Sequence, residues 1–251
     1  MPVPTPVLPT ITPAPQVSDG SFGDGTWIVG DDINPGTYET PNKDGSCYWA
    51  RLSRLTGALD EIMANEIAVG RAIVTIVAND MAFTSQGCGE WTILDYGDEP
   101  FETIMSGTWV VGVDITAETY QTTNSEGTCY WARLSGFSGE LDEIVANALG
   151  ENRVVVTIEN SDTGFKSSNC GLWTLVEPSA TLNTSFFDGI WIVGDDIVPG
   201  TYSTPNTEND CYWARLSGFG GSLEDIKANE ASAGRTVVNI EARDVGFLSS
   251  S

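Results

Sequence analysis

The sequence predicts an all-β protein: a tandem array of three small antiparallel β-sandwich or barrel-like modules, the third of them truncated. Three observations support this prediction. The chain repeats itself with a period of 82 residues, apolar residues alternate with polar ones, and Gly, Pro and Asn punctuate the alternating segments. Several short antiparallel strands joined by such turns are typical of sandwiches and small barrels.

The repeat is marked by two phrases that recur without insertion. CYWARLS begins at Cys47, Cys129 and Cys211, which are 82 positions apart. CGxWT begins at Cys88 and Cys170, and its third copy would begin at position 252, after the last residue of the chain. We therefore expect a third module without its last strand, in a chain that is part of a longer array.

The repeat also divides the chain into segments. An extended linker is expected at 1–19, modules at 20–94, 105–176 and 187–251, and joints at 95–104 and 177–186. Six of the twelve prolines lie in residues 2–15, a composition that favours an extended spacer. This segment lacks the basic and apolar regions of a signal peptide.

Within module 1 the alternation predicts six strands, and the same pattern follows 82 and 164 residues later. The expected strands are 26–33, 36–40, 46–53, 72–78, 81–85 and 90–94. Residues 59–65 are interpreted as a turn followed by a short strand. Residues 34–37, Asn-Pro-Gly-Thr, predict a type II turn with Gly36 at positive φ. The second copy has Glu118 at this position, so its turn should change type or be strained.

The cysteines predict one disulfide in each complete module. The expected pairs are Cys47 with Cys88 and Cys129 with Cys170, each 41 positions apart, and Cys211 is left unpaired by the truncation. A small domain gains from covalent closure, and a disulfide indicates an extracellular or cell-surface location. Zinc is a poor alternative, because two thiolates without histidine or a CxxC pair make an incomplete site.

Charge and composition exclude several classes of function. The formal net charge of -24 opposes nucleic-acid binding, and the lack of histidine removes Ser-His-Asp and Cys-His catalysis. Apolar runs are too short to predict a membrane-spanning helix. The acidity fits either adaptation to salt or recruitment of divalent cations.

An aromatic and an arginine in the CYWARLS phrase form a candidate ligand platform. Trp49 and Arg51 project from one face of their strand, where they could bind a sugar or a cation. In the alternative, structural interpretation Arg51 lies along Trp49 and pairs with Asp60 or Glu61. The candidate ligand-binding residues are Tyr48, Trp49, Arg51, Tyr130, Trp131, Arg133, Tyr212, Trp213 and Arg215.

Acidic pairs suggest one candidate metal site and argue against catalysis. Asp31 with Asp32 and Asp195 with Asp196 could contribute to a calcium site, although Val113 replaces the first Asp in module 2. Asp32 and its equivalents could instead cap the turn. No other cofactor and no catalytic residue are expected, because the acidic pairs recur with the repeat and exchange Asp for Glu, which catalysis would tolerate poorly.

The motifs DIxPGTY, CYWARL and CGxWT together resemble modules of secreted or surface-anchored bacterial proteins of unknown function. The resemblance covers nearly all of residues 24–251. It implies an exterior location and brings no ligand with it. We expect a non-enzymatic extracellular spacer or multivalent, adhesion-type array that contacts a surface glycan or protein. The alternative is a set of carbohydrate-binding modules appended to a larger secreted enzyme.

Overall fold

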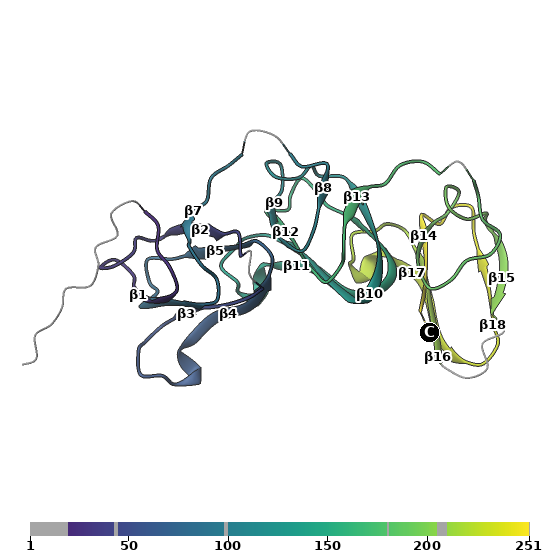
Figure 1. The fold of residues 1–251 in the computed structure, drawn as a ribbon. Coiled ribbons are helices and arrows are strands. Elements are labelled where there is room, and N and C mark those ends of the chain that lie inside the picture. The colour runs from purple at the N-terminus through teal and green to yellow at the C-terminus, as the bar shows by residue number, and fades with distance from the viewer. Residues whose placement is uncertain (1–19, 43–44, 98–99, 180, 205–209, 251) are drawn as a thin grey trace, which may run out of the picture.

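The protein forms three all-β modules in a row (Figure 1). The computed structural model describes residues 20–42, 45–97, 100–179, 181–204 and 210–250, so the predicted linker at 1–19 lies outside the described residues. Module 1 contains β1 (Gly25–Ile28), β2 (Gly36–Thr40), β3 (Ser46–Leu52), the 3₁₀ turn η1 (Leu59–Glu61), β4 (Ile62–Val69), β5 (Ala72–Ile76), β6 (Ala82–Gln86) and β7 (Thr92–Ile93).

The same elements recur in the next two modules. Module 2 contains β8 (Thr103–Ile104), β9 (Gly107–Val110), β10 (Thr119–Leu134), η2 (Leu141–Glu143), β11 (Ile144–Thr157), β12 (Gly164–Ser168) and β13 (Trp173–Leu175). Module 3 contains β14 (Gly189–Ile192), β15 (Gly200–Thr204), β16 (Asp210–Leu216), η3 (Leu223–Asp225), β17 (Ile226–Ala233), β18 (Thr236–Ile240) and β19 (Gly246–Ser250).

Within each module the strands pair antiparallel in two sheets, and one parallel pair, β11 with β14, joins modules 2 and 3 into a single ten-stranded sheet. In module 1 the strand orders are β1-β6-β3-β4 and β5-β2-β7. In module 2 the long strands β10 and β11 run through both sheets, whereas in module 3 the described part of the second sheet is the pair β15-β18. The predicted turn in residues 59–65 is present as η1, but β4 continues to Val69 and is longer than expected.

Aromatic side chains fill the space between the two sheets. In module 1, Phe83 makes an edge contact with Trp91 at 5.2 Å between ring centroids and stacks on Trp49 at 6.2 Å. Phe165 repeats both contacts with Trp173 and Trp131 in module 2. Aromatic rings bury a large apolar area per residue, which helps a domain of this size to hold a core.

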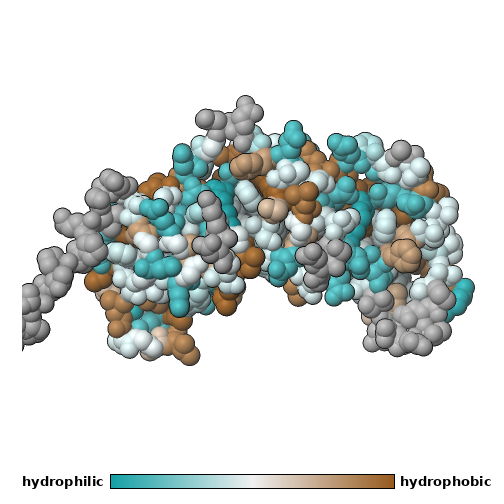
Figure 2. Space-filling view, in the orientation of Figure 1, coloured by the Kyte–Doolittle hydropathy of each residue, from teal (hydrophilic) through white to brown (hydrophobic). Residues whose placement is uncertain are grey.

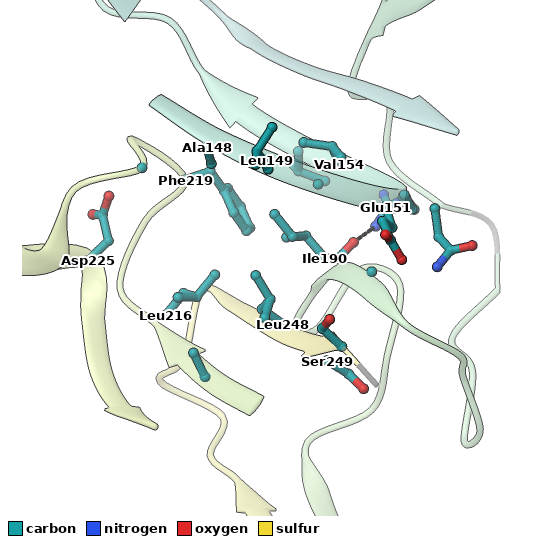
Figure 3. A pocket seen from close by; sticks show the side chains of 18 of the residues that line it. Ala148, Leu149, Glu151, Val154, Ile190, Leu216, Phe219, Asp225, Leu248 and Ser249 are labelled. Atoms are coloured by element: carbon teal, nitrogen blue, oxygen red, sulfur yellow. Dashed lines mark hydrogen bonds between the residues drawn. The ribbon is translucent and has the colours of Figure 1, made fainter. Parts of the chain in front are cut away.

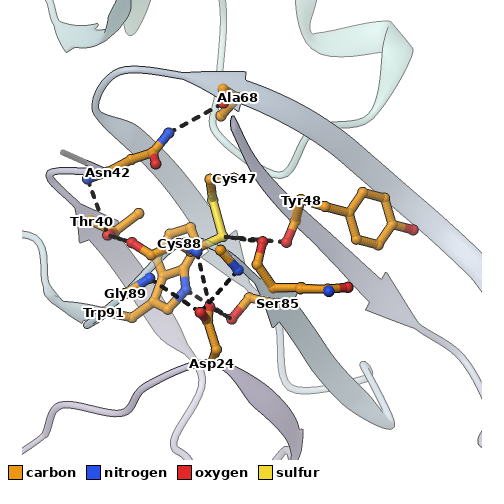
Figure 4. The surroundings of a disulfide bond; sticks show 12 residues. Asp24, Thr40, Asn42, Cys47, Tyr48, Ala68, Ser85, Cys88, Gly89 and Trp91 are labelled. Carbon is orange, nitrogen blue, oxygen red and sulfur yellow. Dashed lines mark hydrogen bonds between the residues drawn. A yellow bond between two sulfur atoms is a disulfide. The ribbon is translucent and has the colours of Figure 1, made fainter. Parts of the chain in front are cut away.

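A disulfide closes each of the first two modules. Cys47 is bonded to Cys88 and Cys129 to Cys170, the pairs that the spacing predicts, while Cys211 is a buried free thiol. Figure 4 shows how the loop around Cys88 is held: the Asp24 carboxylate accepts the N–H groups of Gly87 and Cys88 at 2.9 and 3.0 Å.

The predicted type II turn is wrong. The reversal after β1 is made at Gly30, whose φ is 90°, whereas Gly36 is the first residue of β2 and is not among the residues with positive φ. Position 36 therefore does not require glycine, and Glu118, its equivalent in module 2, is likewise not among the residues with positive φ. In all three modules the hydroxyl of Tyr38 or its equivalent donates to the carbonyl four residues earlier.

We expect the disulfide to contribute substantially to stability. A bridge closing a loop of 41 residues stabilises a domain by about 4 kcal/mol in the chain-entropy model. The variant C47A/C88A should therefore unfold its first module at a clearly lower guanidinium concentration, followed by tryptophan fluorescence. C211A, which removes a thiol without breaking a bridge, is the control, and an equal midpoint for both variants would contradict the prediction.

Candidate functional site

In modules 1 and 2 the residues of the predicted ligand platform lie where one module meets the next, whereas Tyr212, Trp213 and Arg215 of module 3 are half-buried. Trp49 and Arg51 are each 1% exposed, and Trp131 and Arg133 are 2% and 4% exposed. Tyr48 and its equivalents are half-buried. Because Trp49, Arg51, Trp131 and Arg133 are covered by the following module, we describe the site as a junction between modules. Ligand binding by the platform stays a prediction.

Arg51 is held first by its own module. Its Nε and Nη2 donate to the two carboxylate oxygens of Asp80 at 2.8 and 2.9 Å. The predicted partners Asp60 and Glu61 are wrong: Asp60 accepts a bond from Arg54, and Glu61 is buried and accepts N–H groups of its own loop. The bidentate geometry fixes the plane of the guanidinium.

The remaining nitrogen of the arginine reaches the following module. Nη1 of Arg51 donates to the Ser138 carbonyl at 2.8 Å and to the Glu140 carboxylate at 3.2 Å. Nη1 of Arg133 donates to the Gly220 carbonyl at 3.0 Å, so the second junction repeats the contact. Each arginine thus pairs within one module and binds the backbone of the next.

The loop that accepts this bond lies just before the 3₁₀ turn. We call residues 136–140 and 218–222 the docking loops of modules 2 and 3. A Cβ added at Gly139 would lie 2.5 Å from the Trp49 ring, and one added at Gly221 would overlap the Trp131 ring. Both glycines have φ of 79°, so the close approach and the backbone conformation each require glycine.

A phenylalanine anchors each docking loop. The carbonyl of Phe137 accepts the N–H of Thr75 at 2.7 Å, and its ring packs with Ile73, Leu94 and Val110. The carbonyl of Phe219 likewise accepts the N–H of Thr157 in module 2 at 2.9 Å. The loop therefore binds by backbone bonds and by a buried aromatic ring.

A second arginine joins the start of the following module. The carbonyl of Arg71 accepts the N–H of Thr108 at 2.8 Å, and its guanidinium binds Glu39 and Asp114 and lies over the Trp109 ring at 5.5 Å. In the second junction, the guanidinium of the equivalent arginine at position 153 lies over a tryptophan ring at 5.3 Å. This contact adds a charged pair and a cation–π interaction to each junction.

These contacts define one receiving face per module. The four equivalent positions on each face are Trp49, Arg51, Arg71 and Ile73 in module 1, Trp131, Arg133, Arg153 and Val155 in module 2, and Trp213, Arg215, Arg235 and Val237 in module 3. Figure 1 shows the yellow-green turn η3 of module 3 lying against module 2, next to β10.

On module 3 the arginine of the receiving face pairs entirely within the module. Arg215 binds Asp244 at 2.6 and 3.0 Å and Glu241 at 2.6 Å, and Lys227 binds Asp244 at 2.7 Å. Burial acts to raise the pKa of Asp244, but the hydrogen bonds from Arg215 and Lys227 lower it to about 2. This aspartate therefore stays ionised and stabilises module 3 at neutral pH, and its contribution is lost as the pH falls from about 4 through 2.

The two junctions differ beside the docking loop. In the first, Lys166 binds Glu66 at 2.5 Å. The equivalent residues of the second junction are Leu248 and Ala148, and a cavity of about 600 Å³ lies there, lined also by Ile190 (Figure 3). At the first junction a cavity of about 200 Å³ lies beside Glu66 and Lys166, and another of about 640 Å³ lies between residues 63–65 and 139–142. The arginine, glycine and phenylalanine contacts are thus common to both junctions, and the rest varies.

The candidate calcium carboxylates lie at the turn after the first strand of a module. Asp32 and Asp196 each accept the backbone N–H four residues earlier, and Asp196 also binds Arg153 at 2.7 Å. Asp195 accepts a backbone N–H of the preceding joint, and Asp31 is exposed. Among the described residues, no group of three or more His, Cys, Asp or Glu could hold a metal ion. Calcium binding here stays a prediction.

The docking residues were missed at the sequence level although their signal was present. Arginine recurs at 71, 153 and 235 with the period of the repeat, and Gly-Phe-x-Gly occurs at 136–139 and 218–221. Both patterns share the period of the core residues, and periodicity does not separate a contact within a module from a contact between modules. Figure 2 shows hydrophilic surface gathered around both junctions, where charged residues surround the buried contacts.

Three similar β domains docked in a row, two of them closed by a disulfide, define a tandem-repeat protein. The chain belongs to the family of the Rv1352-like extracellular domain, whose model matches residues 19–92, 101–174 and 183–251. It is therefore an extracellular repeat protein, and the third match is shorter than the others. No curated protein and no solved structure matches the chain. In the described part, no helix is long and apolar enough to cross a membrane.

Gly139 and Gly57 provide a matched test of the junction. Both have positive φ, at 79° and 83°, but Gly57 has nothing within 4 Å of its missing Cβ. G57A should cost about 1 kcal/mol from backbone strain alone, and G139A a further 1–3 kcal/mol or so from overlap with Trp49. Guanidinium unfolding measures both, and equal losses would contradict the assigned contact.

Proposed function

We propose that the chain is a non-enzymatic extracellular spacer in which docked modules hold a fixed distance and direction. The observation that carries this proposal is the burial of Trp49 and Arg51, because the most strongly repeated residues of the chain bind the next module. A flexible string of beads would need no such contacts, whereas a stiff array depends on them.

The contacts of the junction are of the kind that restrict relative motion. Phe137 of module 2 packs a buried ring against module 1, and Arg51 of module 1 makes a charge-assisted bond to module 2. A parallel backbone bridge between Arg71 and Gly107 adds a third contact. Three separate points of attachment define an orientation, not merely a proximity. A spacer of this kind transmits direction as well as distance.

The carbohydrate-binding alternative needs an exposed aromatic platform. Of its three residues in module 1, Trp49 and Arg51 are buried and Tyr48 is half-buried, which favours the spacer. Glycan-array binding by the intact chain that is lost on replacing Tyr48 and its equivalents by Ala would reverse this preference.

A phenylalanine substitution tests the spacer. F137A/F219A removes the ring that fills each junction, and we expect a larger radius of gyration in small-angle scattering and a broader single-molecule FRET distribution between modules 1 and 3. L55A is the matched control, because Leu55 is the equivalent residue of module 1 and is 50% exposed. If the FRET distribution of F137A/F219A is as narrow as that of the wild type, the rigid-spacer proposal fails.

One feature also supports a multivalent role. Leu59, Leu141 and Leu223, the first residues of the three 3₁₀ turns, are 85%, 84% and 86% exposed. The array would present the same apolar side chain three times, and tethered weak contacts add in avidity. We expect L59S/L141S/L223S to reduce retention on bacterial surfaces far more than any single change. Unchanged retention would contradict this role.

A further inference from the structure

The two ends of the array differ in what they offer. A junction needs a docking loop from one module and a receiving face from the module before it. Among the described residues, no module packs on the loop of module 1 or on the receiving face of module 3. The chain therefore carries one unused loop and one unused face, and their residues can be compared with the occupied ones.

The receiving face of module 3 keeps the chemistry of the occupied faces. Val237 is 49% exposed, whereas its equivalents Ile73 and Val155 are 3% and 1% exposed. The Arg215 side chain is 14% exposed and Arg235 is exposed. The apolar and cationic positions of the face are thus present and accessible.

The unused loop of module 1 has lost the docking residues. Gly136 and Phe137 are replaced by Arg54 and Leu55, and both replacements are exposed. Figure 2 shows apolar surface at this lower end of module 1, where the loop before η1 projects away from the other modules in Figure 1.

The residue that lies against the phenylalanine ring differs between modules in step with the phenylalanine itself. A Cβ added at Gly164 or Gly246 would overlap the ring of Phe137 or Phe219. Module 1 has Ala82 at this position, beside a loop that carries no phenylalanine. The Gly and Phe are therefore present together or absent together, as expected if both exist for docking.

We propose that the loop of module 1 is not a docking loop and that the receiving face of module 3 docks a further module of this family that carries a Gly-Phe-x-Gly loop. The proposal goes beyond the spacer function, because it depends on the junction contacts and not on what the array does. The interface is head-to-tail and continues the two described junctions: the new loop would place its phenylalanine on Val237, its second glycine on Trp213 and a carbonyl on Arg215.

Restoring the docking residues of module 1 tests the proposal with the full chain. In R54G/L55F/A82G the first loop acquires the Gly-Phe-x-Gly sequence and the space for its ring. Sedimentation velocity should show concentration-dependent assembly at a concentration at least about tenfold lower than for the wild type. L55F/A82G, which keeps Arg54, repeats the test with fewer changes if the triple variant fails to fold.

Charge reversals on module 3 separate docking from other association. Adding R235E to the assembling variant should return it to a monomer, whereas the charge reversal E90K, at an exposed site of module 1 that belongs to neither the docking loop nor a receiving face, should leave assembly intact. A folded variant that stays monomeric would overturn the proposal. Assembly that survives R235E, or that non-reducing gels trace to disulfides of Cys211, would also overturn it. Scattering from the wild-type chain tests the spacer separately.

Discussion

A buried arginine shared between two modules is the interaction on which the array depends. The guanidinium of Arg51 has five N–H donors in a rigid plane, and the Asp80 carboxylate takes two of them within the module. This leaves Nη1 aimed at the Ser138 carbonyl of the next module. An ion pair at this depth is costly to break, because either partner alone would be a buried charge. Folding of one module thus positions a donor for the next.

The contacts that recur in both junctions are those at which a different side chain would not fit. Gly139 and Gly221 combine positive φ with close contact to a tryptophan ring. Glycine is the only amino acid that satisfies both conditions, because it has no Cβ. Beside them, the Lys166–Glu66 pair of one junction gives way to the apolar cavity of the other. The loop and arginine contacts fix how modules meet, while the surrounding contacts are free to vary.

Much of the fold could be predicted from the sequence. The period, the alternation and the cysteine spacing identify three β modules and two disulfides, because these features are local to one module. The role of Trp49 and Arg51 could not be predicted. Strand alternation shows that they share a face, but not that this face is covered by a chain segment 87 residues further on. The Arg51 partner was likewise misassigned, since Asp80 is brought close only by the pairing of β3 with β6.

The turn predicted at residues 34–37 shows a second limit of prediction from sequence. Pro35-Gly36 matches a familiar turn pattern, but the backbone reverses at Gly30, where positive φ is used, and Gly36 begins a strand. Local sequence favours a turn of some kind near these residues, and the register of β2 with β5 decides where it falls. Asp32 is explained in the same way, because its carboxylate accepts the N–H of Ile28 across the reversed backbone.

The placement of the arginines has a consequence for how these molecules crowd together. Six of the eleven basic residues occupy receiving faces, at positions 51, 71, 133, 153, 215 and 235, while the acidic residues number 35. The flanks of the array are therefore left strongly anionic. Two arrays lying flank to flank would repel one another over about 10 Å at 0.1 M salt. Lateral bundling is thereby discouraged, and individual arrays stay apart even where many are packed on one surface.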